Sequence, residues 1–161
     1  MITQERLREL VRYCPETGIF TWKSSSINRV KIGDVAGTLR KDGYFRIQID
    51  GKLYFAHRLA WFYIHGNLPI YHIDHIDGNR FNNRINNLRD VDRLTNNQNI
   101  KHAQQKNKST GLLGVTKHRS KFMAQITING IHKYLGCFDN AHKAHEVYLS
   151  AKRNYHKGCT I

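Results

Sequence analysis

The segment from His72 to Asn96 constrains the fold of this chain most, because its strand and turn signals are closely spaced. Asp74 and His75 are neighbours, so on an extended strand their side chains leave on opposite faces. Both side chains reach one point only if the chain bends there. Asp77-Gly78 supplies a tight turn directly afterwards. The segment therefore predicts a strand that ends at a turn, with a polar side chain on each face.

A second strand and a helix are expected after this turn. Asn87-Leu88-Arg89 is suited to a short returning strand, and Asp92 is suited to cap a helix that carries Asn96. Two strands and a helix that gather a histidine and asparagines around one carboxylate resemble the ββα-metal site of the HNH endonuclease family. The resemblance runs from His57 to Asn99, roughly a quarter of the chain.

These residue types suit phosphodiester hydrolysis, which needs a base for the attacking water and a cation for the departing oxygen. A neutral imidazole is available as a base near neutral pH. Hard ions such as Mg²⁺ prefer a few oxygen ligands and keep positions open for a phosphate. The resemblance implies one Mg²⁺ or Mn²⁺ ion held by Asp74 and Asn96, with His75 as the general base and Asn87 holding the loop and orienting His75.

Other assignments of these residues stay open. Asn97 and Asn99 are rival ligands to Asn96, and an amide oxygen argues against tightly held zinc, since imidazole is the better ligand for transition metals. The His-x-x-His spacing of His72 and His75 would suit zinc, but the partner cysteines are missing. A surface or phosphate-contacting His72 is therefore favoured. The run of asparagines alone would fit a plain loop, but the agreement of all the motifs favours a nuclease site.

The charge of the chain is typical of a nucleic-acid partner. It carries 26 lysines and arginines against 12 acidic residues, a net charge of +14. Such a charge attracts polyanions without selecting a sequence. Residues 99–161 hold 11 basic and 2 acidic residues, whereas residues 1–98 hold 15 and 10. The C-terminal part is therefore expected to bind double-stranded DNA more strongly than the N-terminal part. The alternative is that its basic residues only form a solvated surface.

The cysteines and the hydropathy pattern indicate the compartment. Cys14, Cys137 and Cys159 are far apart and odd in number, which is typical of reduced intracellular thiols. No apolar run reaches membrane-spanning length, and the N-terminal residues lack the hydrophobic stretch of a signal peptide. We expect a cytoplasmic protein, in the host cell if the chain is phage-encoded, with no membrane partner and no small-molecule cofactor.

The N-terminal third is predicted to be a scaffold. Thr3 is expected to cap a short helix that includes Val11 and ends before Pro15. A β-rich stretch begins at Gly18. Asp50-Gly51, between two alternating segments, is a strong signal for a two-residue hairpin.

A second helix and a linker are expected further along the chain. The apolar segment 58–64 predicts a compact helix closed by Gly66, with its aromatic side chains in the core. Arg58 is a candidate phosphate contact. Residues 99–109 are polar and lack a hydrophobic period, so they predict the end of the preceding helix and then a linker.

Residues 110–158 are expected to form a second unit of three strands and a helix. Asn129-Gly130 predicts a tight turn between two of the strands. Asn140 is expected to cap a helix whose small alanines allow it to pack closely on the sheet. The strands are predicted from alternation in residues 113–118, 121–128 and 131–138.

This unit is similar to the plant APETALA2-type DNA-binding domain, which also occurs beside phage HNH nucleases. The likeness rests on the order and spacing of Gly114-Val115, Ala124-x-Ile126 and Leu135-Gly136-x-Phe138. In that family the sheet lies in the major groove. Several of the family's arginines and tryptophans are replaced here, so its base preference is not implied, and a plain solvent-facing strand is the alternative at each position. The resemblance implies DNA contacts by Thr116, Lys117, His118, Arg119, Lys121, Gln125, Thr127, His132 and Tyr134.

The sequence as a whole predicts an α+β protein. It should combine a small β-hairpin and helix N-terminal part with a ββα-metal nuclease core, and a three-stranded antiparallel sheet packed on one helix. The expected domains are residues 1–98 for the nuclease, 99–109 for the linker and 110–158 for DNA binding. The combination resembles phage-encoded HNH homing endonucleases, which implies metal-dependent DNA cleavage. A DNA-binding or regulatory protein with a vestigial site is the main alternative, and a structural or packaging role in a phage is a third.

Overall fold

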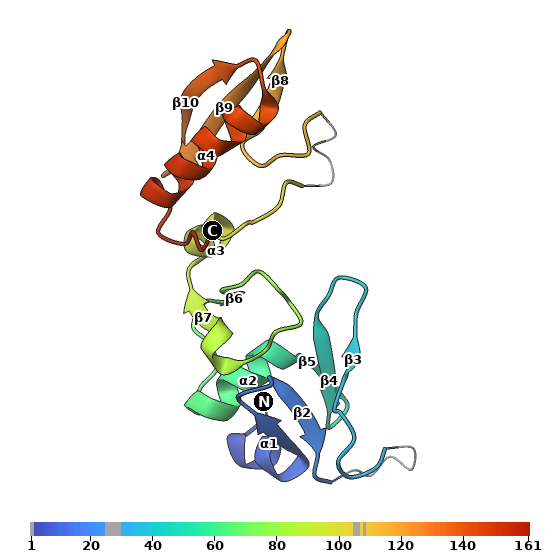
Figure 1. The fold of residues 1–161 in the computed structure, drawn as a ribbon. Coiled ribbons are helices and arrows are strands. Elements are labelled where there is room, and N and C mark those ends of the chain that lie inside the picture. The colour runs from blue at the N-terminus through green and yellow to red at the C-terminus, as the bar shows by residue number, and fades with distance from the viewer. Residues whose placement is uncertain (1, 25–29, 105–106, 108) are drawn as a thin grey trace. The chain divides into compact units, whose positions relative to one another are not determined.

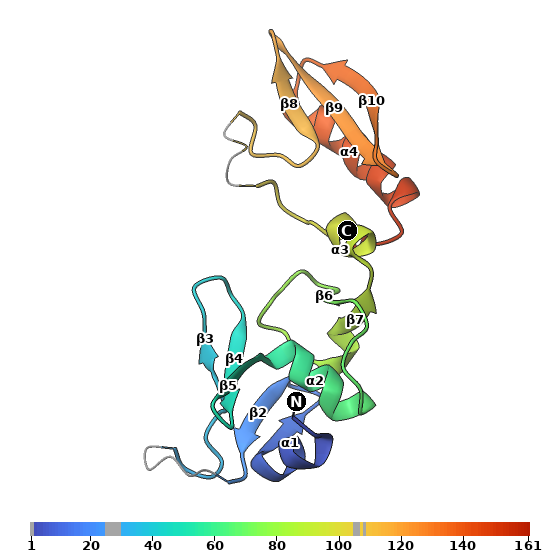
Figure 2. The same cartoon turned by 180° about the vertical axis from the view of Figure 1, so that it is seen from behind.

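The computed structural model describes residues 2–24, 30–104, 107 and 109–161. Over these residues it holds four α-helices and several small antiparallel sheets, which confirms the predicted α+β class (Figures 1 and 2). Contacts divide the chain into two compact units, Met1–Asp92 and Arg93–Ile161. The domain boundaries expected at residues 98 and 109 stay predictions. Residues 105, 106 and 108 of the predicted linker lie outside the described residues.

The first unit begins with helix α1 (Gln4–Leu10). Its predicted cap is confirmed, because the Thr3 Oγ1 accepts a hydrogen bond from the backbone N–H of Arg6. The side chain of Gln4 in turn donates from Nε2 to the carbonyl oxygens of Phe62 and Tyr63. These two carbonyls lie near the end of the second helix, where backbone acceptors lack partners within the helix.

The predicted extension of α1 through Val11 is wrong. Val11 begins strand β1 (Val11–Cys14), which pairs antiparallel with β2 (Ile19–Trp22). Val11 and Tyr13 are both buried in the core, at 0% and 4% exposure. Alternate residues share one face of a strand, so extended backbone buries both side chains.

A three-stranded sheet follows. Strands β3 (Thr38–Leu39), β4 (Phe45–Ile49) and β5 (Lys52–Phe55) lie in sequential order and are antiparallel. The predicted hairpin turn is confirmed, because Asp50 and Gly51 both have positive φ, at 47° and 76°. Two successive positive φ values match the twist of a two-residue hairpin.

Helix α2 (Ala56–His65) packs on these strands and ends at Gly66, as predicted, with a φ of 76°. Its buried residues are Ala56, His57, Leu59, Ala60 and Phe62. A histidine therefore lies among the apolar residues of the helix that face the core. The chain continues through β6 (His72–His75), the short 3₁₀ helix η1 (Ile85–Asn87) and β7 (Leu88–Val91).

The second unit holds the predicted three strands and one long helix. The strand order is β10-β9-β8, all antiparallel, and α4 lies across one face of this sheet (Figures 1 and 2). The predicted Asn140 cap is confirmed, since its Oδ1 accepts from the backbone N–H groups of His142 and Lys143. The elements are α3 (Arg93–Gln98), β8 (Val115–His118), β9 (Lys121–Ile128), β10 (Ile131–Phe138) and α4 (Ala141–Tyr155).

The end of the chain packs on α3 within this unit. The backbone N–H of Gly158 donates to Gln98 Oε1 at 3.0 Å, and Thr160 Oγ1 lies 2.6 Å from Asn99 Oδ1. In the part of the chain that the structure describes, no helix is long and apolar enough to cross a membrane.

Replacing Gly114 by alanine should destabilise the second unit strongly. Gly114 has a φ of +73°, and an added Cβ would lie 2.0 Å from the buried ring of Tyr148. Overpacking of this kind costs about 1–3 kcal/mol, in addition to the cost of a positive φ. Gly130→Ala is the matched control, because Gly130 has a φ of +82° with nothing within 4 Å of the added Cβ. Urea unfolding followed by circular dichroism should show the larger loss for Gly114→Ala, and equal losses would contradict the predicted clash.

Candidate active site

The end of strand β6 brings the predicted catalytic residues together. β6 and β7 pair antiparallel, with Asp74 opposite Arg89 and His75 opposite Leu88. This confirms the two predicted strands, except that Asn87, expected in the second strand, ends the 3₁₀ helix η1 and the strand begins at Leu88. The backbone N–H of Gly78 donates to the carbonyl of His75 at 2.8 Å, so the predicted turn begins at the last residue of the strand. Asp74 and His75 are 7% and 4% exposed, and both are therefore shielded from bulk water.

His75 lies in a buried aromatic and polar environment. Its Nε2 is 3.2 Å from Asn83 Oδ1. Its ring packs edge-on against the ring of His57, with the centroids 5.3 Å apart, and lies 6.1 Å from the ring of Tyr44. Asn83 is itself only 3% exposed. The imidazole is thus held on one edge by an amide and on its sides by two rings.

Burial keeps the two neighbouring histidines neutral. Burial is the largest cause that lowers the pKa of His75, and the hydrogen bond to Asn83 Oδ1 and the carboxylates of Asp77 and Asp74 oppose it. Burial also lowers the pKa of His57 to about 3. A neutral His75 can accept a proton, which is the property that a general base needs.

Asn87 ties down the loop that follows β6. Its Nδ2 donates to Asp77 Oδ1 at 2.9 Å and to the carbonyl of Asn82 at 2.8 Å, while its Oδ1 accepts from the Asp77 N–H at 3.0 Å. The side chain that bonds His75 directly is Asn83, which sequence reasoning missed. Asn83 is one of several asparagines in this stretch, and its spacing gives no signal that separates it from the others.

Asp74 is paired with an arginine from the neighbouring strand. Its Oδ2 accepts hydrogen bonds from Arg89 Nε at 2.9 Å and from Nη2 at 2.7 Å. Two bonds from one guanidinium to one carboxylate form a charge-assisted contact with fixed geometry. Sequence reasoning used Arg89 only as a strand residue, because the partner across a strand pair depends on the pairing register.

The donor atoms fit a hard divalent ion better than zinc. Among the described residues, no three His, Cys, Asp or Glu side chains cluster as a zinc site requires. Arg89 bonds the Asp74 carboxylate through Oδ2, so a metal ion bound by Asp74 would share this carboxylate with a guanidinium. A carboxylate is an oxygen ligand of the kind that Mg²⁺ or Mn²⁺ prefers, with waters in other positions.

The second predicted ligand, Asn96, lies on α3 in the second unit. Helix α3 begins directly after Asp92, as the sequence indicates. Asn96 is half-buried and its rival Asn97 is exposed. The other rival, Asn99, is 5% exposed, and its Oδ1 already lies 2.6 Å from the hydroxyl of Thr160. This contact disfavours Asn99, and the assignment of Asn96 stays a prediction.

Comparison with known proteins decides the nature of this segment. Residues 54–98 match the family model described as HNH endonuclease. The chain contains an HNH nuclease domain. The match includes Asp74, His75, Asn87 and Asn96. It supports an enzyme that acts as a nuclease.

One solved structure is also similar to the chain. It is described as "DNA binding and cleavage by the HNH homing endonuclease I-HmuI". The similarity covers 92% of this chain and 88% of that chain, with 26% sequence identity and a TM-score of 0.43. A search of curated proteins gave no match.

Arg58 and His72 were two further candidates for contact with a phosphate. Arg58 is half-buried on α2, next to His57, and its charge is one of the smaller causes that lower the His57 pKa. His72 is exposed at the start of β6, whereas His75 is buried at its end. This difference in burial agrees with a surface position for His72.

Most of the predicted DNA contacts of the second unit share one face of its sheet. Val115 and Ala124 are opposite each other and are buried toward α4, at 1% and 0% exposure. Side chains alternate along a strand, so the next residues in each strand face away from α4. The DNA contacts themselves stay predictions. The residues on this open face are Thr116, His118, Gln125, Thr127, His132 and Tyr134.

The predicted basic contacts lie elsewhere. Lys117 is opposite Phe122, on the α4 side of the sheet, so it does not share the open face. Arg119 lies in the turn between β8 and β9 with a φ of 55°. Lys121 begins β9, and its Nζ is 3.3 Å from the exposed carboxylate of Asp139. Arg119 and Lys121 are exposed, so both are accessible to a phosphate backbone.

Proposed function

We propose that this protein is a metal-dependent DNA endonuclease of the homing type that hydrolyses phosphodiester bonds. One observation carries the proposal: His75, whose pKa is lowered by burial, lies next to the buried carboxylate of Asp74 inside the segment that matches the HNH endonuclease family. A base and a metal-binding carboxylate on adjacent residues can act on opposite sides of the same phosphate. The turn at Gly78 directly after His75 supplies the bend that this requires.

Each residue has a separate role in the proposed reaction. His75 takes a proton from the water that attacks the phosphorus. By the family resemblance Asp74 and Asn96 would hold the metal ion, and Asn87 keeps the loop after β6 in place through its bonds to Asp77. A bound Mg²⁺ or Mn²⁺ ion would supply the positive charge that stabilises the crowded phosphate and the departing 3′ oxygen.

Incubation of supercoiled plasmid with the protein tests this function. Nicked or linear DNA should form with Mg²⁺ or Mn²⁺, and EDTA should stop its formation. Nicking and double-strand cleavage are distinguished by the same gel. DNA binding without any cleavage in either metal would support the alternative of a regulatory protein with a vestigial site.

The second unit is proposed to bind DNA through the open face of its sheet. Six polar or aromatic side chains lie on that face, and the stretch 99–161 carries 11 basic residues against 2 acidic ones. Exposed cations at the end of the β8–β9 hairpin, Arg119 and Lys121, are placed to contact phosphates beside the face. We propose that phosphate contacts set the affinity, while side chains on the open face set the target preference.

Point substitutions test this unit better than truncation does. The hydrogen bonds from Gly158 to Gln98 and from Thr160 to Asn99 would be lost if the chain were cut near residue 105. Arg119→Gln with Lys121→Gln leaves these bonds in place. Each lost phosphate contact should make the slope of log affinity against log salt shallower by about 0.9.

Lys133→Gln is the matched control for this salt titration. Lys133 is opposite Ile126, and its Nζ lies 4.8 Å from the ring centroid of Tyr155 on α4, so it is not on the open face. The slope of the control should equal that of the unaltered protein. An unchanged slope in the Arg119 and Lys121 variant would argue against phosphate contacts at this hairpin.

A further inference from the structure

The hydrogen bond between Asn83 and His75 is buried on both sides. Asn83 is 3% exposed and His75 is 4% exposed, and Asn83 Oδ1 lies 3.2 Å from His75 Nε2. We propose that Asn83 is a positioning residue that keeps the proton of neutral His75 on Nε2, so that Nδ1 is the atom that receives the proton of water. The inference rests on the proposed function for the role of His75 as the base.

The tautomer follows from the chemistry of the two groups. A neutral imidazole carries one N–H and one unprotonated nitrogen, and an amide oxygen only accepts hydrogen bonds. Nε2 must therefore be the donor to Asn83 Oδ1, and Nδ1 is the unprotonated nitrogen. When water attacks, its O–H bond breaks and an N–H bond forms at Nδ1, while the hydroxide oxygen forms the new bond to phosphorus. The resulting imidazolium keeps its Nε2–H bond to Asn83.

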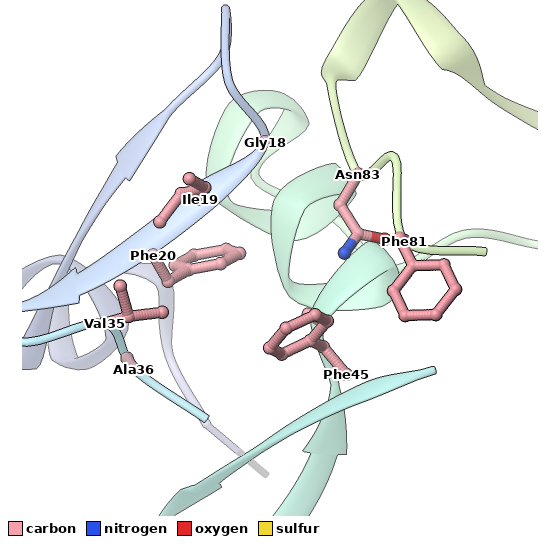
Figure 3. Close-up of a pocket in the computed structure, with 9 residues that line it drawn as sticks. Gly18, Ile19, Phe20, Val35, Ala36, Phe45, Phe81 and Asn83 are labelled. Atoms are coloured by element: carbon pink, nitrogen blue, oxygen red, sulfur yellow. The ribbon is translucent and has the colours of Figure 1, made fainter. Parts of the chain in front are cut away.

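The surroundings of Asn83 leave its side chain few other polar partners. An apolar cavity of about 50 Å³ lies beside it (Figure 3). An amide that turned into this cavity would lose its hydrogen bond to His75 without gaining another, which costs free energy in a buried site. Apart from Asn83, the lining residues are glycine or apolar: Gly18, Ile19, Phe20, Val35, Ala36, Phe45, Ala56 and Phe81.

The N-terminal hairpin holds the backbone of Asn83. The hydroxyl of Tyr13, which is 4% exposed, donates to the carbonyl oxygen of Asn83 at 2.7 Å. Gly18 lies against the peptide after Asn83, because a Cβ added there would be 2.5 Å from Asn83 C and from Arg84 N (Figure 3). Residues about seventy positions away therefore fix the backbone that carries this amide.

The tautomer can be measured without DNA and without metal. In ¹⁵N NMR of the full chain at a pH where the ring is neutral, the protonated and unprotonated ring nitrogens resonate far apart. The His75 signals are assigned by their loss in His75→Ala. We expect the Nε2–H tautomer in the unaltered protein, and a dominant Nδ1–H tautomer would overturn the proposal. This measurement is independent of cleavage, so it separates failure of the inference from failure of the proposed function.

Substitutions at position 83 link the tautomer to the rate. Asn83→Leu has a similar size but no acceptor, so it should mix the two tautomers and lower kcat by on the order of 10²-fold, with KM changed less than about twofold. Asn83→Asp keeps an acceptor oxygen but adds a negative charge that raises the pKa of His75, so at a pH where the ring is neutral it should retain the Nε2–H tautomer and kcat to within about tenfold. Asn86→Leu is the matched control at an exposed asparagine, and it should leave both readouts unchanged.

If Asn83→Leu does not fold, Tyr13→Phe tests the positioning role of Asn83 instead. It removes only the hydroxyl bond to the Asn83 carbonyl, and it should lower kcat several-fold without changing KM. A folded Asn83→Leu variant with unchanged kcat and an unchanged tautomer would refute the role of Asn83. Equal loss of kcat in Asn83→Leu and Asn83→Asp, at a pH where the ring is neutral in both, would also refute it, because the acceptor oxygen would then not matter.

Discussion

Replacing His75 by alanine should remove most DNA cleavage and leave DNA affinity nearly unchanged. A general base acts mainly in the transition state, so its loss lowers the rate more than the binding of substrate. The expected loss is on the order of 10²- to 10⁴-fold. Single-turnover cleavage and equilibrium binding of the same duplex measure the two quantities separately.

His72→Ala is the matched control for this substitution. It removes the same side chain from the same strand, but His72 is exposed whereas His75 is buried. The control should cleave within a few-fold of the unaltered rate. Undiminished cleavage by His75→Ala would show that the base has been assigned to the wrong residue.

Replacing Asp74 by asparagine should abolish metal-dependent cleavage. The substitution preserves the size of the side chain but removes the negative charge, which is the property that binds a hard cation. Stabilisation by a metal ion contributes several kcal/mol to such reactions, so the rate should fall by at least about 100-fold. Cleavage over a range of Mg²⁺ and Mn²⁺ concentrations gives both the rate and the metal requirement.

Two further comparisons locate the metal ligands. Asp50→Asn is the matched control, since Asp50 is exposed in a hairpin turn and its carboxylate pairs with the surface residue Arg6. In the same assay, Asn96→Ala should be severe and Asn97→Ala mild. The reverse order would mean that the ligand on α3 had been placed one residue off. Persistent cleavage in EDTA would refute the metal requirement itself.

Elements with strong local signals were predictable from the sequence. Asp50-Gly51 adopts the positive φ values that its residue types favour, and Gly66 ends α2 in the same way. Asn140 caps α4 with bonds to residues two and three positions ahead. In each case the interactions that decide the structure join residues close in sequence, so a short stretch of chain contains the information.

Features that depend on distant partners were not predictable in this way. The spacing of Leu7, Leu10 and Val11 suits a helix, but Val11 instead pairs with Trp22 in a sheet. The contact between Asp74 and Arg89 depends on the register of two strands, and a shift of one residue would separate them.

The site residue that was missed follows the same rule. Asn83 is held by Tyr13, seventy positions earlier, and nothing in the asparagine-rich stretch marks it as different from its neighbours. Likewise, α3 follows the nuclease strands directly in sequence, but contacts group it with the C-terminal unit. Long-range packing thus decided which asparagine lies against His75.

Arg89 gives Asp74 a positive neighbour that belongs to the chain itself. A buried carboxylate is costly without a counter-charge, and a site balanced by metal alone would loosen whenever the metal is withdrawn. Here two hydrogen bonds from Arg89 on β7 to Asp74 on β6 supply that counter-charge from within the protein. If the reaction needs the proposed metal, we expect the protein to stay folded in chelator, so that it can be mixed with DNA there and the reaction started by adding the ion.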